Sequence, residues 1–221
     1  MNIKEGIEKR FSVRAFTDEV PSMDIIKEIL ITANSAPSGG NIQPWKVYVL
    51  NEETKKALAE KTLHNFDNGV QEEIEYDIYP KPLADEYKKR RYECGADMYK
   101  ALSIEKDDLD SRFKQIRENY NFFGAPLGMI ITIDRSFGRN GWGHVGMFLE
   151  NLWLSAIDKG LGLCLQESWS IYPKTVKEIT KHPDNEIVWC GVAIGYEDKE
   201  DPINQYRTSR EELESFVRFV K

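Results

Sequence analysis

The spacing of hydrophobic and polar residues predicts a chain in which helices alternate with strands. Apolar residues at helical spacing, such as Ile25, Ile26 and Ile29 within residues 23–33, predict amphipathic helices. Alternating or continuous apolar runs rich in β-forming residues predict strands. The helices expected in this way are residues 3–10, 23–33 (with Ser22 as the N-cap), 52–61, 107–119, 142–159 and 173–179, and the strands are residues 45–50, 126–134 and 187–194, followed by a final β-like run at 216–220.

Three segments depart from a simple amphipathic pattern. Residues 142–159 are apolar almost all round, which predicts a helix buried in the core or in a subunit interface. Residues 35–44 combine two glycines with two prolines and therefore predict a loop. Between residues 64 and 92 the periodicity weakens and predicts no element. No repeat or linker divides the chain, so residues 1–221 are expected to form a single domain.

Composition and charge narrow the classes of function. The 221 residues carry 30 Lys and Arg against 37 Asp and Glu, a formal net charge of −7, which argues against a nucleic-acid binder that relies on diffuse basic attraction. Hydrophobic residues at 41% are typical of a folded globule and exclude disorder as the main state. No apolar run approaches the roughly 20 residues that cross a bilayer, and the N-terminus is too polar for a signal peptide. We therefore expect a cytoplasmic protein that has no membrane partner.

The cysteines and histidines do not indicate a metal site or hydrolytic chemistry. Cys94, Cys164 and Cys190 contain no Cys-x-x-Cys pair, and their odd number argues against a disulfide scaffold and against structural zinc. The three histidines are scattered, and neither a Gly-x-Ser-x-Gly elbow nor a Walker sequence occurs. His144, in the glycine-rich approach to the apolar helix, is expected to be a capping or core residue. No metal is expected.

Three polar segments have the composition of ligand-binding sites. Residues 10–14 place two arginines around a serine, a set that can hold a phosphate by charge-assisted hydrogen bonds. Residues 37–45 combine glycines, which let backbone amides approach a ligand, with Asn and Gln side chains that can pair with the edge of a planar ring. Residues 206–210 again hold two arginines among hydroxyl groups. Taken alone, each segment also fits a solvated surface or a tight turn.

Taken in order along the chain, these motifs resemble the FMN-dependent nitroreductase family. The motifs that carry the resemblance are Arg10-x-Ser12-x-Arg14-x-Phe16, PSGGNIQPW at residues 37–45, NFFGAP at 121–126, the stretch 146–169, and AIGYEDKEDPIN at 193–204 followed by Arg207 and Arg210. Together they cover nearly the whole chain in the family's order. The middle region is most similar to members that reduce nitroaromatic compounds such as nitrobenzoates.

The resemblance implies an architecture and a cofactor. The fold expected is α+β, with a central mixed β-sheet wrapped by helices, made as an intertwined homodimer whose flavin sites lie at the subunit interface. FMN is the cofactor implied, with NAD(P)H as the electron donor. An interface position suits the apolar helix at residues 142–159, which a monomer of this size can hardly cover on every side.

The resemblance also carries cofactor contacts over to this chain. Arg10 and Ser12 are expected at the FMN phosphate or ribityl chain, and Arg14 is expected beside the N1 and O2 edge of the ring. A fixed guanidinium at that edge would stabilise the negative charge of reduced flavin. The other expected contacts are Pro37, Ser38, Gly39, Asn41 and Gln43 from the second subunit, Leu165 and Gln166 near ring atoms N5 and O4, and Arg207 and Arg210 at the phosphate.

The activity implied is that of a ping-pong oxidoreductase. NAD(P)H reduces FMN, and a nitroaromatic acceptor then takes the electrons on a path through nitroso to hydroxylamine. Tyr87 and Arg91 are candidates for contacts to an anionic small-molecule acceptor, with a solvated helix face as the alternative. Reduction of a quinone or an activated C=C bond by the same fold, and a non-catalytic flavin-binding protein, are the alternative functions.

Overall fold

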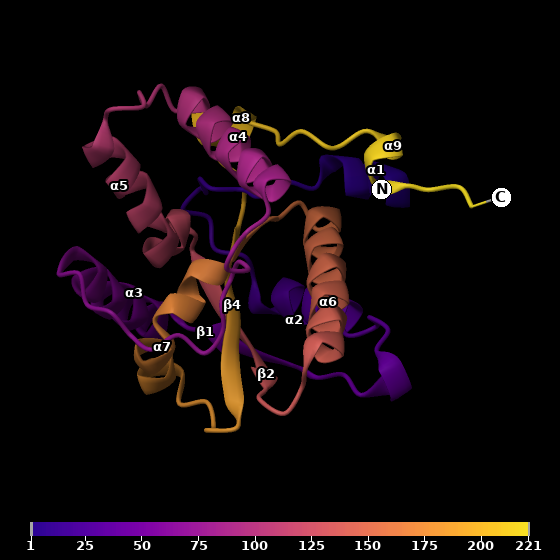
Figure 1. Ribbon diagram of the computed structural model, residues 1–221. Coiled ribbons are helices and arrows are strands. Elements are labelled where there is room, and N and C mark those ends of the chain that lie inside the picture. The colour runs from indigo at the N-terminus through magenta and orange to yellow at the C-terminus, as the bar shows by residue number, and fades with distance from the viewer. Residues whose placement is uncertain (1, 221) are drawn as a thin grey trace.

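A four-stranded antiparallel sheet forms the centre of the computed structural model, which describes residues 2–220 (Figure 1). The strands are β1 (Trp45–Leu50), β2 (Leu127–Asp134), β3 (Gly162–Gln166) and β4 (Glu186–Gly195), in the order β1-β2-β4-β3. Each neighbouring pair is antiparallel. Within residues 2–220, the parallel component of the expected mixed sheet is an isolated bridge between Ser12 and Leu163.

Helices on both sides of this sheet confirm the predicted α+β class. The helices are α1 (Ile3–Lys9), α2 (Met23–Ala33), α3 (Glu52–Asp67), α4 (Asp85–Ala101), α5 (Leu109–Arg117), α6 (Arg139–Asp158), α7 (Pro173–Thr180), α8 (Pro202–Gln205) and α9 (Leu213–Phe216), with 3-10 helices η1 (Gly39–Asn41), η2 (Glu118–Gly124) and η3 (Glu167–Ile171). The predicted cap of α2 is present, because Ser22 Oγ accepts a hydrogen bond from the Ile25 amide at 3.3 Å.

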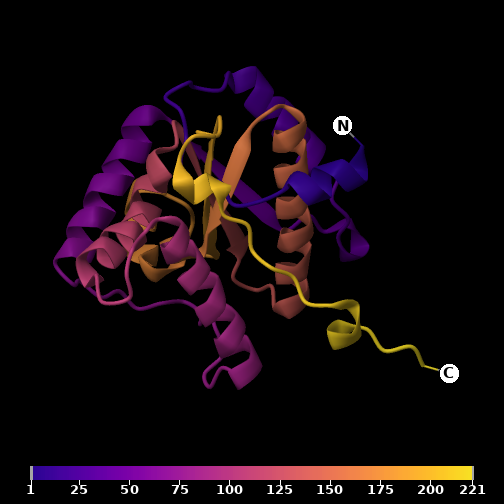
Figure 2. The same cartoon turned by 90° about the horizontal axis from the view of Figure 1, so that it is seen from above.

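Two hydrophobic clusters hold the helices to the two faces of the sheet (Figures 1 and 2). The first cluster joins α2 and α6 to the sheet, and the second joins α3, α7, η2 and η3 to it. Along β2, Met129 and Ile131 belong to the first cluster whereas Ile130 belongs to the second, as the alternation of a strand requires. Full burial of each such side chain contributes about 1.5–3 kcal/mol to stability.

A β-bulge interrupts the pairing of β2 with β4. Ile131 is in register with Cys190 and Thr132 with Val188, so Trp189 has no partner in this register. The Trp189 carbonyl instead accepts a hydrogen bond from the Tyr76 hydroxyl at 2.6 Å. The bulge therefore fastens the long segment between α3 and α4 to the sheet.

Three elements differ from the sequence-based expectation. β3 forms where only the end of a helix was expected, because this short strand is defined by its pairing with β4. α4 occupies part of the segment without periodicity, and none of its described residues is buried, so it has no apolar stripe to recognise. Residues 216–220 form no strand, and the chain beyond α8 runs outward through α9 (Figure 2). None of the helices described between residues 2 and 220 is both long and apolar enough to cross a membrane.

Candidate functional site

The segment that carries Ser12 and Arg14 is fixed along the edge of the sheet beside β3. The Val13 amide donates to the Leu163 carbonyl at 3.0 Å, next to the bridge between Ser12 and Leu163. Further on, the Thr17 amide donates to the Tyr196 carbonyl at 2.9 Å. These bonds extend the sheet by one short stretch of chain and place Ser12 and Val13 beside Leu163 and Gly162, at the start of β3.

Arg14 is held at both its backbone and its side chain. Its amide donates to Oδ1 of Asn204 at 2.9 Å, and its guanidinium lies 6.0 Å from the centre of the Phe123 ring. Asn204 is buried and donates in turn to the carbonyls of Ala15 and Asp198, at 2.8 and 2.7 Å. Within residues 2–220 the Arg14 guanidinium forms no ion pair with a carboxylate, so its charge is available to a ligand.

The other arginines expected at the cofactor phosphate do not converge in a single chain. Arg10 stacks on Trp153, 4.6 Å from the ring centre, and its Nε lies 3.9 Å from Glu150 Oε1 on α6. Arg207 does join the Arg14 segment, because it lies 3.5 Å from the centre of the Phe11 ring. Arg210 forms its hydrogen bonds within residues 208–210. Arg207 thus lies against Phe11, beside Arg10 in the sequence, whereas the Arg10 side chain contacts α6 and Arg210 bonds locally.

Leu165 and Gln166 end β3 where the chain turns into η3. The Gln166 amide nitrogen donates to the Asn119 carbonyl at 2.6 Å, and its Oε1 accepts from Trp169 Nε1 at 3.3 Å. Trp169 packs so closely on Gly191 that a Cβ there would lie 2.0 Å from Trp169 Cδ1. The Gln166 side chain is therefore occupied in the structure, and the backbone of this turn is what a ligand can contact.

Two further groups in this turn have the character of a ligand-binding surface. Ser168 Oγ is buried and has no hydrogen-bond partner among the described residues. Partial desolvation raises the pKa of the Glu167 carboxyl. Burial also raises the pKa of the neighbouring Cys164 thiol, which is thus kept protonated. The Ser168 hydroxyl after β3 and the Arg14 guanidinium beside the start of this strand, which donates to the Ser12 carbonyl at 3.4 Å, fit a polar planar cofactor that carries hydrogen-bonding edges.

The loop that contains Pro37, Ser38, Gly39, Asn41 and Gln43 is tightly wound. Gly40, Asn41 and Gln43 have left-handed φ values of 60°, 56° and 51°, which is uncommon for residues other than glycine. The Gln43 amide donates to Ser38 Oγ at 2.9 Å. The Gly39 amide donates to His144 Nε2 at 3.2 Å, so His144 caps this loop.

The loop and the Arg10 segment are attached to different parts of α6. The loop contacts α6 at His144, whereas Arg10 contacts it at Glu150 and Trp153. Nine residues from His144 to Trp153 correspond to about 13 Å along a helix at 1.5 Å per residue. The two predicted groups of cofactor contacts are consequently separated along α6 within one chain.

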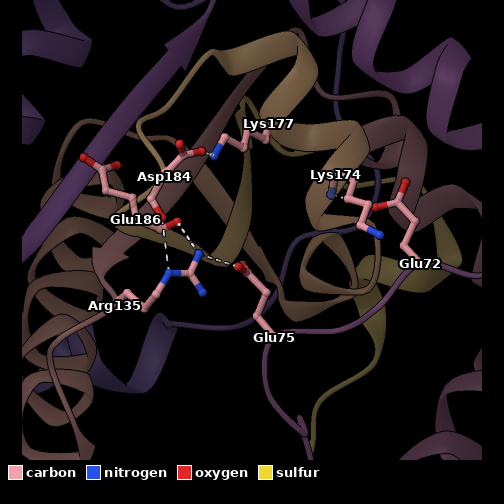
Figure 3. A network of polar contacts seen from close by, with 7 residues as sticks. All are labelled: Glu72, Glu75, Arg135, Lys174, Lys177, Asp184 and Glu186. Atoms are coloured by element: carbon pink, nitrogen blue, oxygen red, sulfur yellow. Dashed lines mark hydrogen bonds and ion pairs between the residues drawn. The ribbon is translucent and has the colours of Figure 1, made fainter.

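The segment between α3 and α4, for which the sequence predicted no element, is anchored by acidic side chains (Figure 3). Glu72 accepts from the amides of Lys174 and Thr175, at 2.7 and 3.2 Å, and caps the start of α7. Glu75 forms an ion pair with Arg135 at 2.7 Å. With the bond from Tyr76 to β4, these contacts fix the segment against the sheet and η3.

Of the two residues predicted for the acceptor, Arg91 borders a cavity of the described residues. It lines two neighbouring cavities of about 480 and 310 Å³. Tyr87 lines neither of these two cavities. The centre of its ring lies 5.4 Å from Cζ of Arg90.

Asn204 was not predicted from the sequence as a site residue, although it ends the motif at residues 193–204. The available signal was the Asp-Pro pair just before it, which starts α8.

Comparison with known proteins agrees with this geometry. The sequence profile described as "Nitroreductase family" matches residues 7–196. The chain belongs to the nitroreductase family. It is 34% identical to the 4-nitrobenzoate reductase of Nocardioides sp. (strain LMS-CY), over 96% of this chain and 87% of that protein. It is 32% identical to the nitrobenzene nitroreductase of Ectopseudomonas oleovorans, over 99% and 96%.

Solved structures of nitroreductases share the whole fold. The crystal structure of the FMN and NADPH-dependent nitroreductase NfnB from Sphigopyxis sp. strain HMH superposes with a TM-score of 0.96 at 34% identity, and the alignment covers 100% of both chains. NfnB from Mycobacterium smegmatis superposes with a TM-score of 0.92 at 24% identity and also covers 100% of both chains. The predicted nitroreductase-like fold is confirmed.

Proposed function

We propose that this nitroreductase is an FMN-dependent NAD(P)H oxidoreductase that reduces a nitroaromatic acceptor to the hydroxylamine. The observation that carries the proposal is the match over its full length, at 34% identity, to a structure described as FMN and NADPH-dependent. The acceptor class follows from the curated relatives, which are named for nitrobenzoate and nitrobenzene reduction. Two observations support the cofactor assignment: the Arg14 guanidinium forms no ion pair within residues 2–220, and the Ser168 hydroxyl has no hydrogen-bond partner among the described residues.

The chain's own residues would bind and orient FMN, which supplies the two-electron chemistry when bound. Arg14 would place positive charge beside the ring and would stabilise the negative charge of the reduced flavin. The backbone of the turn after β3 would also contact the ring. The full set of proposed cofactor contacts is Arg10, Ser12, Arg14, Leu165, Gln166, Arg207 and Arg210 in one subunit, with Pro37, Ser38, Gly39, Asn41 and Gln43 in the other.

We further propose that the enzyme is a homodimer with a shared site. The separation of the two contact groups along α6 supports this arrangement, because a second copy can supply the loop that one chain holds away from Arg10. The C-terminal segment after α8 also supports a homodimer. Its apolar residues Phe216, Phe219 and Val220 are 69%, 82% and 95% exposed in the single chain, and a second copy can cover them. Sedimentation is expected to give twice the 25.6 kDa chain mass, and a stable monomer that retains FMN would contradict the shared site.

We also propose that residues 1–221 act as a single domain in the cytoplasm. Both hydrophobic clusters pack against the same sheet, which supports one domain. The three cysteines are free thiols, with Cys164 and Cys190 buried and Cys94 exposed, and free thiols suit a reducing compartment.

Absorption spectroscopy of the purified protein tests the proposed function. An oxidised flavin band should be present, should bleach when NADH or NADPH is added without oxygen, and should return when a nitroaromatic is added. If the oxidised flavin band returned with a quinone or an enone but not with a nitroaromatic, the result would favour the alternative acceptors. Bound flavin that no nicotinamide reduces would indicate a non-catalytic flavin-binding protein, and absence of flavin after incubation with FMN would reject the proposal.

A further inference from the structure

The larger of the two cavities that meet at Arg91 is mainly apolar and includes three charged side chains, Asp77, Lys81 and Arg91. It measures about 480 Å³ and lies between the segment that precedes α4 and the end of η3. Its apolar and aromatic lining consists of Ile74, Tyr76, Ile78, Tyr79, Pro80, Pro82, Leu83 and Ile171. Pockets of this composition with a few well-placed polar groups are typical of small-molecule sites.

Arg91 is the uncompensated charge of this cavity. The other ions in its lining, Lys81 and Asp77, form an ion pair with each other at 2.7 Å. The Arg91 guanidinium lies 4.3 Å from the centre of the Tyr79 ring and, within residues 2–220, forms no ion pair. The adjacent Arg90 differs, because Glu211 lies 2.7 Å from its Nε and Glu86 lies 3.8 Å from its Nη2.

The smaller cavity places more positive charge on the other side of Arg91. Its lining includes Arg112, which lies 4.3 Å from the centre of the Tyr99 ring and forms no ion pair within the described residues. Lys88, also in the lining, pairs with Asp85 at 2.9 Å. No carboxylate lines this cavity among the described residues, although the whole chain carries a net charge of −7. The local potential around Arg91 therefore favours an anion.

The larger cavity borders the turn assigned to the flavin ring. Ser170 and Ile171, which line it, belong to the same 3-10 helix that begins directly after Gln166. Tyr76, also in the lining, is held by its bond to the Trp189 carbonyl. The adjoining Glu75 forms its ion pair with Arg135 (Figure 3). A ligand in this cavity would thus lie next to the place where the acceptor must receive electrons.

We propose that this cavity binds an aromatic carboxylate, with the ring against Tyr79 and the isoleucine and proline walls and the carboxylate on the Arg91 guanidinium. An arginine fork can donate two hydrogen bonds to one carboxylate, and its stacking on Tyr79 pre-orients it. This assignment rests on the proposed function and narrows it: the acceptor is a nitroaromatic acid, and Arg91 selects for the acid group.

Binding of unreactive ligands tests the site independently of catalysis. The FMN-loaded full-length protein is titrated calorimetrically with benzoate and with the neutral benzamide. Arg91→Gln is expected to weaken benzoate binding about tenfold and to leave benzamide binding unchanged, with Arg91→Lys in between because it keeps the charge without the fork. Arg90→Gln is the matched control on the same helix and is expected to bind both ligands like the wild type.

Kinetics then tests the substrate class. The ratio of kcat/KM for 4-nitrobenzoate to kcat/KM for nitrobenzene is expected to fall about tenfold in Arg91→Gln, or about 1.4 kcal/mol, and to stay constant in Arg90→Gln. If the wild type reduces neither acceptor, the proposed function fails while the benzoate titration still decides the site. Wild-type protein that does not bind benzoate, or an equal loss in Arg90→Gln and Arg91→Gln, would overturn the assignment.

Discussion

Gly162 allows the segment that carries Ser12 and Arg14 to lie directly on β3. A Cβ at Gly162 would lie 2.4 Å from Cγ2 of Val13 and 3.0 Å from its Cβ. Carbon atoms in contact prefer about 3.5–4.0 Å, so Gly162→Ala must move the segment outward by about 1 Å. Overpacking of this kind destabilises a protein by about 1–3 kcal/mol.

The displacement should affect cofactor binding as well as stability. It lengthens the bond from the Val13 amide to Leu163, now 3.0 Å, and shifts the residues on either side of Val13. We expect Gly162→Ala to lower the unfolding midpoint in urea, to lower Tm by about 2–4 °C per kcal/mol, and to weaken FMN binding about tenfold. Urea denaturation and fluorescence titration of the apoprotein with FMN measure the two effects separately.

A double mutant tests whether the contact itself is the cause. Val13→Ala removes both γ-methyl groups and leaves a Cβ to Cβ distance of 3.0 Å, which needs only a small adjustment. The combination of Val13→Ala with Gly162→Ala should therefore recover much of the FMN affinity that Gly162→Ala alone loses. If Gly162→Ala matched the wild type in both measurements, the close contact would not position the segment, and the reasoning would be refuted.

Three other outcomes can be measured. Arg14→Ala should weaken FMN retention or make the flavin potential more negative, and no change in either would remove Arg14 from the site. Glu72→Gln should reduce the free energy of unfolding by about 1 kcal/mol through loss of the cap on α7, as urea titration would show. Arg117 lowers the pKa of Asp67, so the pair stabilises the fold above about pH 4 and less as the pH falls through that lowered pKa; Asp67→Asn should cost about 0.5 kcal/mol at pH 7 and progressively less at acidic pH.

The elements that the sequence predicted are those whose side chains are buried on one face or throughout. α2 extends from Met23 to Ala33 as expected, and β1 from Trp45 to Leu50, because their apolar periodicity reflects contact with the core. α4 could not be predicted in this way because no described residue of it is buried. Its length depends on polar helix-forming residues and on contacts such as the bond from Tyr206 to the Cys94 carbonyl.

The sequence predicted those site residues that lie in local motifs. It did not predict the residues whose position depends on packing between distant parts of the chain. Arg14 and the loop at residues 37–45 lie in segments whose composition already indicated ligand binding. Asn204 acts across 190 positions of sequence on the Arg14 amide, a pairing that no spacing rule reveals. The Trp189 bulge likewise exists only through the register of β2 with β4. Neither the Asn204 contact nor the bulge can be predicted from the sequence unless the arrangement of the sheet is known.

The acidic character of the chain and its preference for an anionic acceptor are compatible because charge acts locally. At physiological ionic strength, interactions between exposed charges are largely screened beyond about 8 Å, so the net charge of −7 governs solubility more than recognition. Several surface carboxylates are neutralised within one helical turn, as in the pairs of Glu5 with Lys9 and Asp85 with Lys88. Arg14 and Arg91 form no ion pair within residues 2–220 and lie at the two proposed ligand sites, so they are the positions at which we expect this chain to distinguish an anion from a neutral ring.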